Sequence, residues 1–175
     1  MKTEGLVHVY YGDGKGKTTA ALGLALRAYG QGMRVTILQF LKNTFTGELA
    51  ALEKLGIRIL RGQGGGRFFP AMTQNEKEYM RKDHDRILTE AAVLAGRGEC
   101  DLLVLDEALD ALLLSMVDER ALAGLLKSKP NGLEIVITGH QPIEWIMETA
   151  DYITEMVKRK HPYDNGIAAR KGIEY

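Results

Sequence analysis

The sequence predicts a three-layer α/β domain built around a mostly parallel sheet. Short apolar segments rich in β-branched residues alternate with longer segments of helix formers, which is typical of parallel strands joined by helical crossovers. A glycine-rich turn joins the first of these strands to the first helix, and a later strand ends in two acidic residues. Because ligands gather at the carboxyl ends of parallel strands, these features favour a nucleotide-binding fold.

The order of elements follows from composition and turn signals. Strands are expected at residues 6–10, 34–40, 57–60, 101–107, 133–138 and 151–156, the last of them at an edge of the sheet. Helices are expected at residues 20–28, 48–55, 74–95, 108–116, 119–128 and 142–150. Thr73 resembles an N-cap with an acid, Glu76, three residues after it, which marks the start of the third helix.

Length and charge bound the function. The chain has 175 residues, which suits a single domain over residues 1–175. Lys and Arg together number 23, as do Asp and Glu, so no basic surplus indicates a nucleic-acid partner. The single cysteine, Cys100, excludes an internal disulfide and suits a reducing cytoplasm. No apolar run approaches the ~20 residues that span a bilayer, so no membrane partner is expected.

Residues 10–19 carry the strongest functional signal. They read Tyr-Tyr-Gly-Asp-Gly-Lys-Gly-Lys-Thr-Thr, whereas the usual phosphate loop reads G-x-x-x-x-G-K-[ST] and has glycine where this chain has Tyr11. The glycines let several backbone N–H groups face a phosphate, Lys17 adds a mobile cation, and the Thr18 hydroxyl is a ligand for Mg²⁺. A glycine-rich turn without a ligand is the weaker alternative. The residues expected to contact nucleotide are Gly12, Asp13, Gly14, Lys15, Gly16, Lys17, Thr18 and Thr19.

Two acids form the second nucleotide-binding signal. Asp106 and Glu107 follow four apolar residues of a buried strand, so they are expected at the same edge of the sheet as the phosphate loop. There either carboxylate can hold Mg²⁺, directly or through water. The alternative is that both acids cap the next helix. His140 follows another strand and is a candidate for a residue that contacts the edge of the ligand. It is a weak candidate for a catalytic base.

Two loops and the tail are less decisive. Lys42 and Phe45 follow the second strand and are either site residues or ordinary surface. Residues 61–72 contain three consecutive glycines and then Phe68 and Phe69, which indicates either a flap that lays an aromatic ring on a flat apolar ligand or a plug for the edge of the sheet. The C-terminal residues 157–175 are expected to dock on the domain, because they contain apolar and aromatic residues.

The chain resembles the P-loop corrinoid adenosyltransferases, the CobA/BtuR/CobO family. The resemblance rests on the loop lacking its first glycine, on Gln39-Phe40-x-Lys42, on Val104-Leu105-Asp106-Glu107, and on the tail from Lys160-His161-Pro162-Tyr163 to Gly172-Ile173-Glu174-Tyr175. It implies a RecA-like fold, a homodimer, and transfer of the 5′-deoxyadenosyl group of ATP to Co(I) of a reduced corrinoid with release of triphosphate. Mg²⁺, or Mn²⁺ in its place, and a flavoprotein reductant are implied as well.

The resemblance also implies roles for individual residues. Lys15 and Lys17 hold phosphates, and Thr18 holds Mg²⁺ with Asp106 or Glu107. Lys17, Thr18 and Glu107 thus form the catalytic set, although Glu107 alternatively reaches the ribose. Arg27 and His140 contact ATP. Alternatively, Arg27 is an ordinary surface residue. Phe69, with Phe68, packs on the lower face of the corrinoid and displaces its axial ligand.

Three departures from the family pattern keep other functions open. Residues 69–71 read Phe-Pro-Ala where the family commonly has Phe-Thr-Trp, and His140 stands where the family often has arginine. The helix that precedes the first strand in longer members is also missing. One alternative is a P-loop kinase or ATPase, which produces ADP. Another is a nucleotide- or corrinoid-binding module without transfer activity, which binds ATP and does not turn it over.

Overall fold

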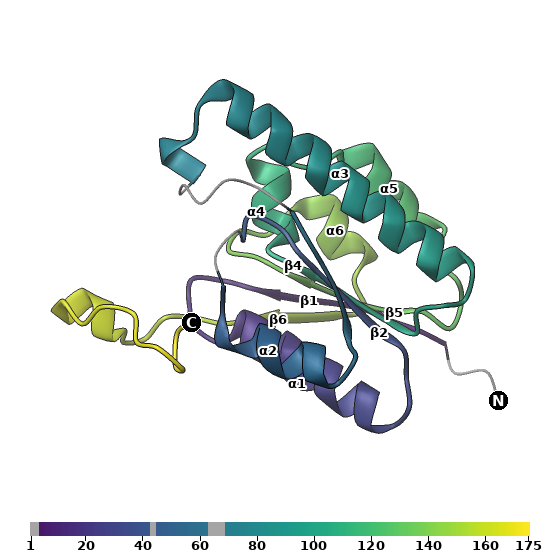
Figure 1. Cartoon of the computed structure of the whole chain (residues 1–175), viewed down its shortest axis with the longest axis horizontal. Helices are drawn as coiled ribbons and strands as arrows, with labels where there is room; N and C mark the ends of the chain where they lie inside the picture. Colours follow the sequence, from purple (N-terminus) through teal and green to yellow (C-terminus); the bar gives the residue numbers. More distant parts are fainter. Residues whose placement is uncertain (1–3, 43–44, 63–68) are drawn as a thin grey trace.

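The computed structural model describes residues 4–42, 45–62 and 69–175 (Figure 1). Its centre is a six-stranded sheet in which every pair of neighbouring strands is parallel. The strands in spatial order are β3 (Arg58–Arg61), β2 (Val35–Gln39), β4 (Leu102–Asp106), β5 (Glu134–Thr138), β1 (Val7–Tyr11) and β6 (Tyr152–Glu155). The expected parallel sheet is confirmed, and β6 lies at an edge as predicted.

Helices cover both faces of the sheet, which gives the three layers predicted from the sequence (Figure 1). One face carries α1 (Lys17–Gly30) and α2 (Gly47–Lys54). The other carries α3 (Gln74–Gly96), α4 (Ala108–Leu113), α5 (Glu119–Lys127) and α6 (Glu144–Thr149). Two short 3₁₀ turns, η1 (Phe69–Ala71) and η2 (Pro162–Asn165), lie outside these layers. Among the described helices, none is long and apolar enough to cross a membrane.

The central strands are buried on both faces, which explains their nearly continuous apolar sequences. In β4, Leu103 and Leu105 belong to the core shared with α3 and α5, whereas Leu102 and Val104 belong to the core shared with α1. Alternate side chains of one strand thus stabilise both outer layers. The apolar part of β4 ends at Asp106, which is itself completely buried.

At two helix ends the backbone conformation explains the difference from the expected bounds. α1 begins at Lys17, three residues earlier than expected, because Gly16 with φ of 118° serves directly as its N-cap. α4 ends at Leu113 because Ser115 adopts a left-handed conformation with φ of 56°, which no glycine announces. The start of α3 was predicted correctly: Thr73 and Glu76 form a capping box.

The glycine loop is packed against the end of β6. Gly14 donates its N–H to the carbonyl of Met156 at 2.6 Å, and Met156 donates to the carbonyl of Tyr11 at 2.7 Å. A Cβ on Gly12 would lie 2.5 Å from the Met156 carbonyl oxygen, and Gly12 has a φ of 112°. Both space and backbone conformation therefore require glycine at this position.

We predict that Gly12→Ala destabilises the fold. The new methyl group meets backbone atoms at a φ that L-residues rarely adopt, so the free energy of unfolding should fall by about 2 kcal/mol or more. Urea unfolding of the variant and the wild type measures the difference. The matched control is Gly124→Ala in α5, where nothing lies within 4 Å of the added Cβ; this change should stabilise by about 0.5–1 kcal/mol. Equal effects of the two substitutions would contradict the packing argument.

Candidate functional site

The phosphate loop curls around the side chain of Lys17. The Lys17 ammonium donates to the carbonyl oxygens of Gly12 at 2.7 Å and Gly14 at 2.8 Å. Burial lowers the pKa of Lys17, and the carboxylates of Asp110 and Asp13 act in the opposite direction. The cation therefore lies on the loop itself, where a bound phosphate can take over its hydrogen bonds.

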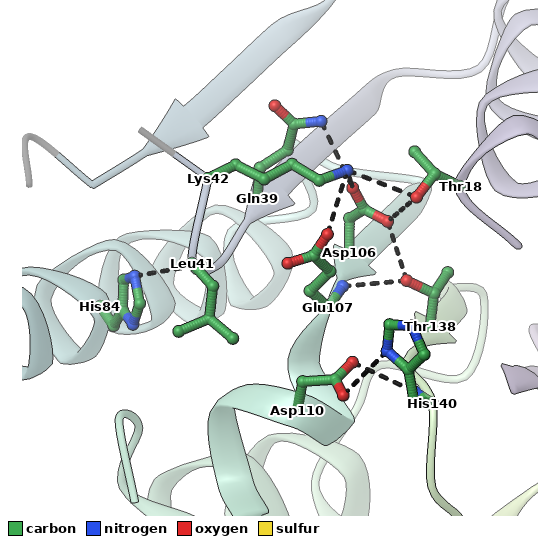
Figure 2. Close-up of polar contacts among 10 residues, drawn as sticks. All are labelled: Thr18, Gln39, Leu41, Lys42, His84, Asp106, Glu107, Asp110, Thr138 and His140. Carbon is green, nitrogen blue, oxygen red and sulfur yellow. Dashed lines mark hydrogen bonds and ion pairs between the residues drawn. The ribbon is translucent and has the colours of Figure 1, made fainter. Parts of the chain in front are cut away.

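Asp106, at the end of β4, is the most fully coordinated side chain of the site (Figure 2). Its Oδ1 accepts hydrogen bonds from the hydroxyls of Thr18 and Thr138, each at 2.8 Å. Its Oδ2 accepts from Lys42 Nζ at 2.6 Å and from Gln39 Nε2 at 3.3 Å. The donors come from α1, β5, β2 and the segment that follows β2. One buried carboxylate therefore ties four parts of the chain together.

Glu107 and Lys42 complete this cluster. Lys42 Nζ lies 3.5 Å from Glu107 Oε1 and 3.4 Å from the Thr18 hydroxyl (Figure 2). Burial lowers the pKa of Lys42, but the attraction of Asp106 and Glu107 and the hydrogen bond to Asp106 outweigh it, so the pKa is raised and the ammonium stays charged. Burial raises the pKa of Glu107, and Lys42 opposes that rise.

The backbone of Glu107 is unusual. Its φ is 61°, in the left-handed region, and it serves as the N-cap of α4 without a capping hydrogen bond from its side chain. Its N–H instead donates to the Thr138 hydroxyl at 2.9 Å. The expected alternative, in which both acids cap α4, does not describe this arrangement. The left-handed turn leaves the carboxylate of Glu107 beside Lys42, partly exposed to solvent.

Two hollows meet at this cluster. The smaller has a volume of about 310 Å³ and is lined by the phosphate loop from Asp13 to Thr19, by Glu107 and by His140. The larger, of about 850 Å³, runs between α1 and α2. Thr18, Thr19, Glu107 and Glu174 line both hollows. A ligand can thus extend from the phosphate loop across Thr18 and Glu107 into the larger hollow.

The C-terminal residues contact the phosphate loop. Glu174 pairs with Lys15 at 2.7 Å and with Arg170 at 3.1 Å, and these hydrogen bonds lower the pKa of Glu174 to about 2. At the other end of the tail, the N–H of Lys158 donates to Asp13 at 2.9 Å. Most tail side chains are nevertheless exposed. The docking of residues 157–175 on the domain stays a prediction that these contacts support.

The other predicted site residues lie at varying distances from the cluster. His140 lines the smaller hollow and its ring is 3.0 Å from Asp110 (Figure 2). Arg27 is exposed on α1 and lines neither hollow. Phe69 packs against the core with Lys77 over its ring at 4.8 Å, and it also lines neither hollow. Phe45 is exposed, and Phe68 lies outside the described residues.

Sequence reasoning assigned no role to several polar residues that the structure brings to the site. Gln39 and Thr138 both contact Asp106, and Asp110 contacts His140. Gln39 ends β2 and pairs with Asp106 in the register of the sheet, and Thr138 ends β5 and pairs with Tyr10. Their position at strand ends is the signal that would have found them. Lys42, which sequence reasoning treated as either surface or site, belongs to the site.

His84 supports the segment that carries Lys42. This histidine is buried in α3, and its Nε2 accepts the Leu41 N–H at 3.2 Å (Figure 2). Its Nδ1–H donates to the Met116 carbonyl at 3.0 Å. Both contacts require the neutral ring with its proton on Nδ1. Burial lowers the pKa of His84, and the Met116 carbonyl, Asp83 and Asp85 oppose that shift. Leu41 has a φ of 57°, so this hydrogen bond holds an uncommon turn immediately before Lys42.

The donor set fits a hard divalent cation better than a transition metal. Thr18, Asp106 and Glu107 offer a hydroxyl and two carboxylates, which are oxygen ligands that suit Mg²⁺. Within the described part of the chain, no group of three or more His, Cys, Asp or Glu is placed to hold a metal. Mg²⁺ commonly takes only one or two carboxylates and completes its shell with phosphate and water. The cluster is therefore compatible with a metal that arrives with a nucleotide.

Comparison with known proteins decides the family. Residues 3–175 match the family described as ATP:corrinoid adenosyltransferase BtuR/CobO/CobP. The chain belongs to this family. The corrinoid adenosyltransferase of Escherichia coli K12 is 32% identical over 98% of this chain and 86% of its own length. The corrinoid adenosyltransferase of Pseudomonas aeruginosa is 34% identical over 98% of this chain and 84% of its own length, and that of Salmonella typhimurium is 32% identical over 100% and 88%.

The fold of this corrinoid adenosyltransferase family member also has a solved counterpart. A KaiC-like protein from Pyrococcus horikoshii superposes with a TM-score of 0.53 at 18% identity, covering 90% of this chain and 75% of the other. At this identity the likeness concerns the fold alone, and it confirms the expected RecA-like architecture.

We predict that His84 makes stability fall at acidic pH. The unfolded chain takes up a proton on this residue near pH 6.5, whereas the folded chain, with its lowered pKa, takes it up only at a lower pH. The free energy of unfolding should therefore decrease as pH falls below about 6.5, by at most about 1.4 kcal/mol per pH unit from this group. Urea unfolding at several pH values, compared between wild type and His84→Gln, measures the effect. A shallower decline is expected for the variant, and equal slopes would contradict the assignment.

Proposed function

We infer that this protein transfers the 5′-deoxyadenosyl group of ATP to Co(I) of a reduced corrinoid and releases triphosphate. The observation that carries this inference is the family match over residues 3–175, which includes both the phosphate loop and the tail. The cluster of Lys17, Thr18 and Asp106 at the end of β4 supports it, because such a cluster suits a polyphosphate and its metal. The kinase or ATPase alternative has no support from the comparisons.

The reaction needs little acid–base chemistry from the protein. Co(I) is the nucleophile: its electron pair forms a bond to C5′ of ATP, the C5′–O bond breaks, and the bonding pair leaves with the triphosphate. Negative charge therefore builds on the leaving group. We propose that Lys17, Lys15 and the N–H groups at the start of α1, which line the smaller hollow, neutralise it. The N–H groups of Gly12 and Gly14 already donate to the carbonyls of His140 and Met156. No general base is required, so we assign His140 to nucleotide contact instead.

We propose that Thr18, Asp106 and Glu107 hold Mg²⁺, or Mn²⁺ in its place. When bound there, the metal supplies positive charge to the leaving triphosphate. We further propose that the smaller hollow receives the triphosphate. The larger hollow, lined by Leu22, Leu26 and other apolar residues of α1 and α2, would receive the apolar parts of the substrates. Glu107, at the boundary of the two hollows, then lies close to the ribose as well.

The resemblance extends the proposal beyond these contacts. We propose that Phe69, with Phe68, packs on the corrinoid and displaces its axial ligand, and that Arg27 contacts the nucleotide. A homodimer that acts in the cytoplasm with a flavoprotein reductant completes the proposal. These assignments rest on the family resemblance. Phe69 lies in η1 and packs against the core, so a contact with the corrinoid requires local movement.

We predict adenosylation of cob(I)alamin in an anaerobic mixture with ATP and Mg²⁺. The Co(I) absorption band should disappear, a light-sensitive alkylcobalamin spectrum should replace it, and phosphorus NMR should show free triphosphate. Lys17→Ala should reduce kcat/KM by about 10²–10³-fold, because it removes charge stabilisation of the leaving group. Formation of ADP and orthophosphate without a cobalt change would instead indicate an ATPase, and tight ATP binding without any reaction a binding module.

Phe69→Ala distinguishes the displacement role from a general role in folding. Activity should fall strongly when Co(II) must first be reduced, and much less when Co(I) is supplied, because ligand displacement matters only before reduction. The two assays are run on the same variant preparation, with thermal unfolding as a check of its stability. Equal losses in the two assays would contradict the displacement role.

A further inference from the structure

The ammonium of Lys42 lies among the groups that are suited to hold a metal. It contacts Asp106 Oδ2 at 2.6 Å, Thr18 Oγ1 at 3.4 Å and Glu107 Oε1 at 3.5 Å (Figure 2). A single cation thus touches all three residues assigned to the metal. Only about one fifth of the Lys42 side chain is exposed, and Asp106 is completely buried.

Charge balance explains why a cation is needed there. A buried carboxylate without a counter-ion is strongly destabilising, and Asp106 has Glu107 as an adjacent carboxylate. The three neutral donors Thr18, Thr138 and Gln39 satisfy hydrogen bonds of Asp106 but carry no charge. Lys42 is therefore a counter-ion that contacts both acids directly.

We propose that Lys42 is a resident cation of the metal site, which a divalent metal must displace before it can bind. The proposal rests on the assignment of Thr18, Asp106 and Glu107 to the metal. An ammonium and a divalent cation that contact the same carboxylate repel each other strongly at such close range, so they compete for it. Binding of the metal therefore moves Lys42 Nζ away from Asp106.

The larger hollow has room for the ammonium of Lys42 after its displacement. Lys42 lines the larger hollow together with Thr18 and Glu107, so its flexible side chain can turn toward a ligand that crosses the boundary of the hollows. Its backbone stays fixed, because the preceding Leu41 N–H is held by His84. A triphosphate at this boundary supplies the negative charge that the ammonium loses. Metal and triphosphate are therefore expected to bind together, and the metal alone only weakly.

Binding of Mn²⁺ without nucleotide tests the proposal directly. The probe is the electron paramagnetic resonance signal of free Mn²⁺, titrated with the whole protein at neutral pH. Lys42→Met removes the charge and keeps an unbranched side chain, so it should bind Mn²⁺ at least about tenfold more tightly than the wild type, because the competing charge is gone. Lys42→Arg keeps the charge and should bind Mn²⁺ as weakly as the wild type.

Two further variants locate the effect. Lys127→Met removes a charge from the last turn of α5, on the face of the sheet away from α1, so Mn²⁺ affinity should stay within about twofold of the wild type. Asp106→Asn added to Lys42→Met should abolish the gain. Thermal unfolding with and without Mn²⁺ provides a second readout, because Mn²⁺ should raise the melting temperature of Lys42→Met more than that of the wild type.

The outcomes separate this proposal from the assignment of the metal site. If Lys42→Met binds Mn²⁺ no more tightly than the wild type, while both bind it in the presence of ATP, the metal site stands and the displacement proposal is overturned. If no variant binds Mn²⁺ even with ATP, the assignment of Thr18, Asp106 and Glu107 fails, and the displacement proposal fails with it.

Discussion

The buried carboxylate of Asp106 is the constraint on which the site depends. A charged group without solvent must be surrounded by donors, and here these donors come from α1, β2, β5 and the segment after β2. Satisfying one side chain therefore fixes the phosphate loop, the strand ends and Lys42 relative to one another. The parallel sheet makes this arrangement available, because it brings the carboxyl ends of its central strands to one edge.

The second support of the site comes from the opposite layer of helices. α3 packs on the face of the sheet away from α1, yet His84 reaches from it to the backbone that precedes Lys42. The segment that carries Lys42 is thus held by α3, whereas its partner Asp106 belongs to β4 of the sheet. Such a link between layers is rigid only while the histidine is neutral, since both of its ring nitrogens have fixed partners. Packing and polar geometry are therefore coupled in this molecule.

Local sequence signals predicted most of the fold. Apolar strands alternating with helices predicted the parallel sheet, and Thr73 with Glu76 predicted the start of α3, because these features depend on neighbouring residues. The contacts of Lys42, Gln39 and Thr138 with Asp106 depend on strand order, which alternation alone does not determine. The left-handed turns at Ser115 and Glu107 could not be predicted from the sequence either, because neither position has the glycine that usually marks such a turn.

The backbone conformation of Glu107 sets thermal stability against catalytic turnover. A glutamate in the left-handed region costs roughly 1 kcal/mol relative to glycine, so the chain retains a strained residue where a relaxed one would fit. Directed evolution that selects for heat resistance alone would enrich glycine or asparagine at this position. The resulting proteins would be more thermally stable and would lack a carboxylate beside Lys42. Libraries built on this scaffold therefore need a selection for turnover alongside the one for thermal tolerance.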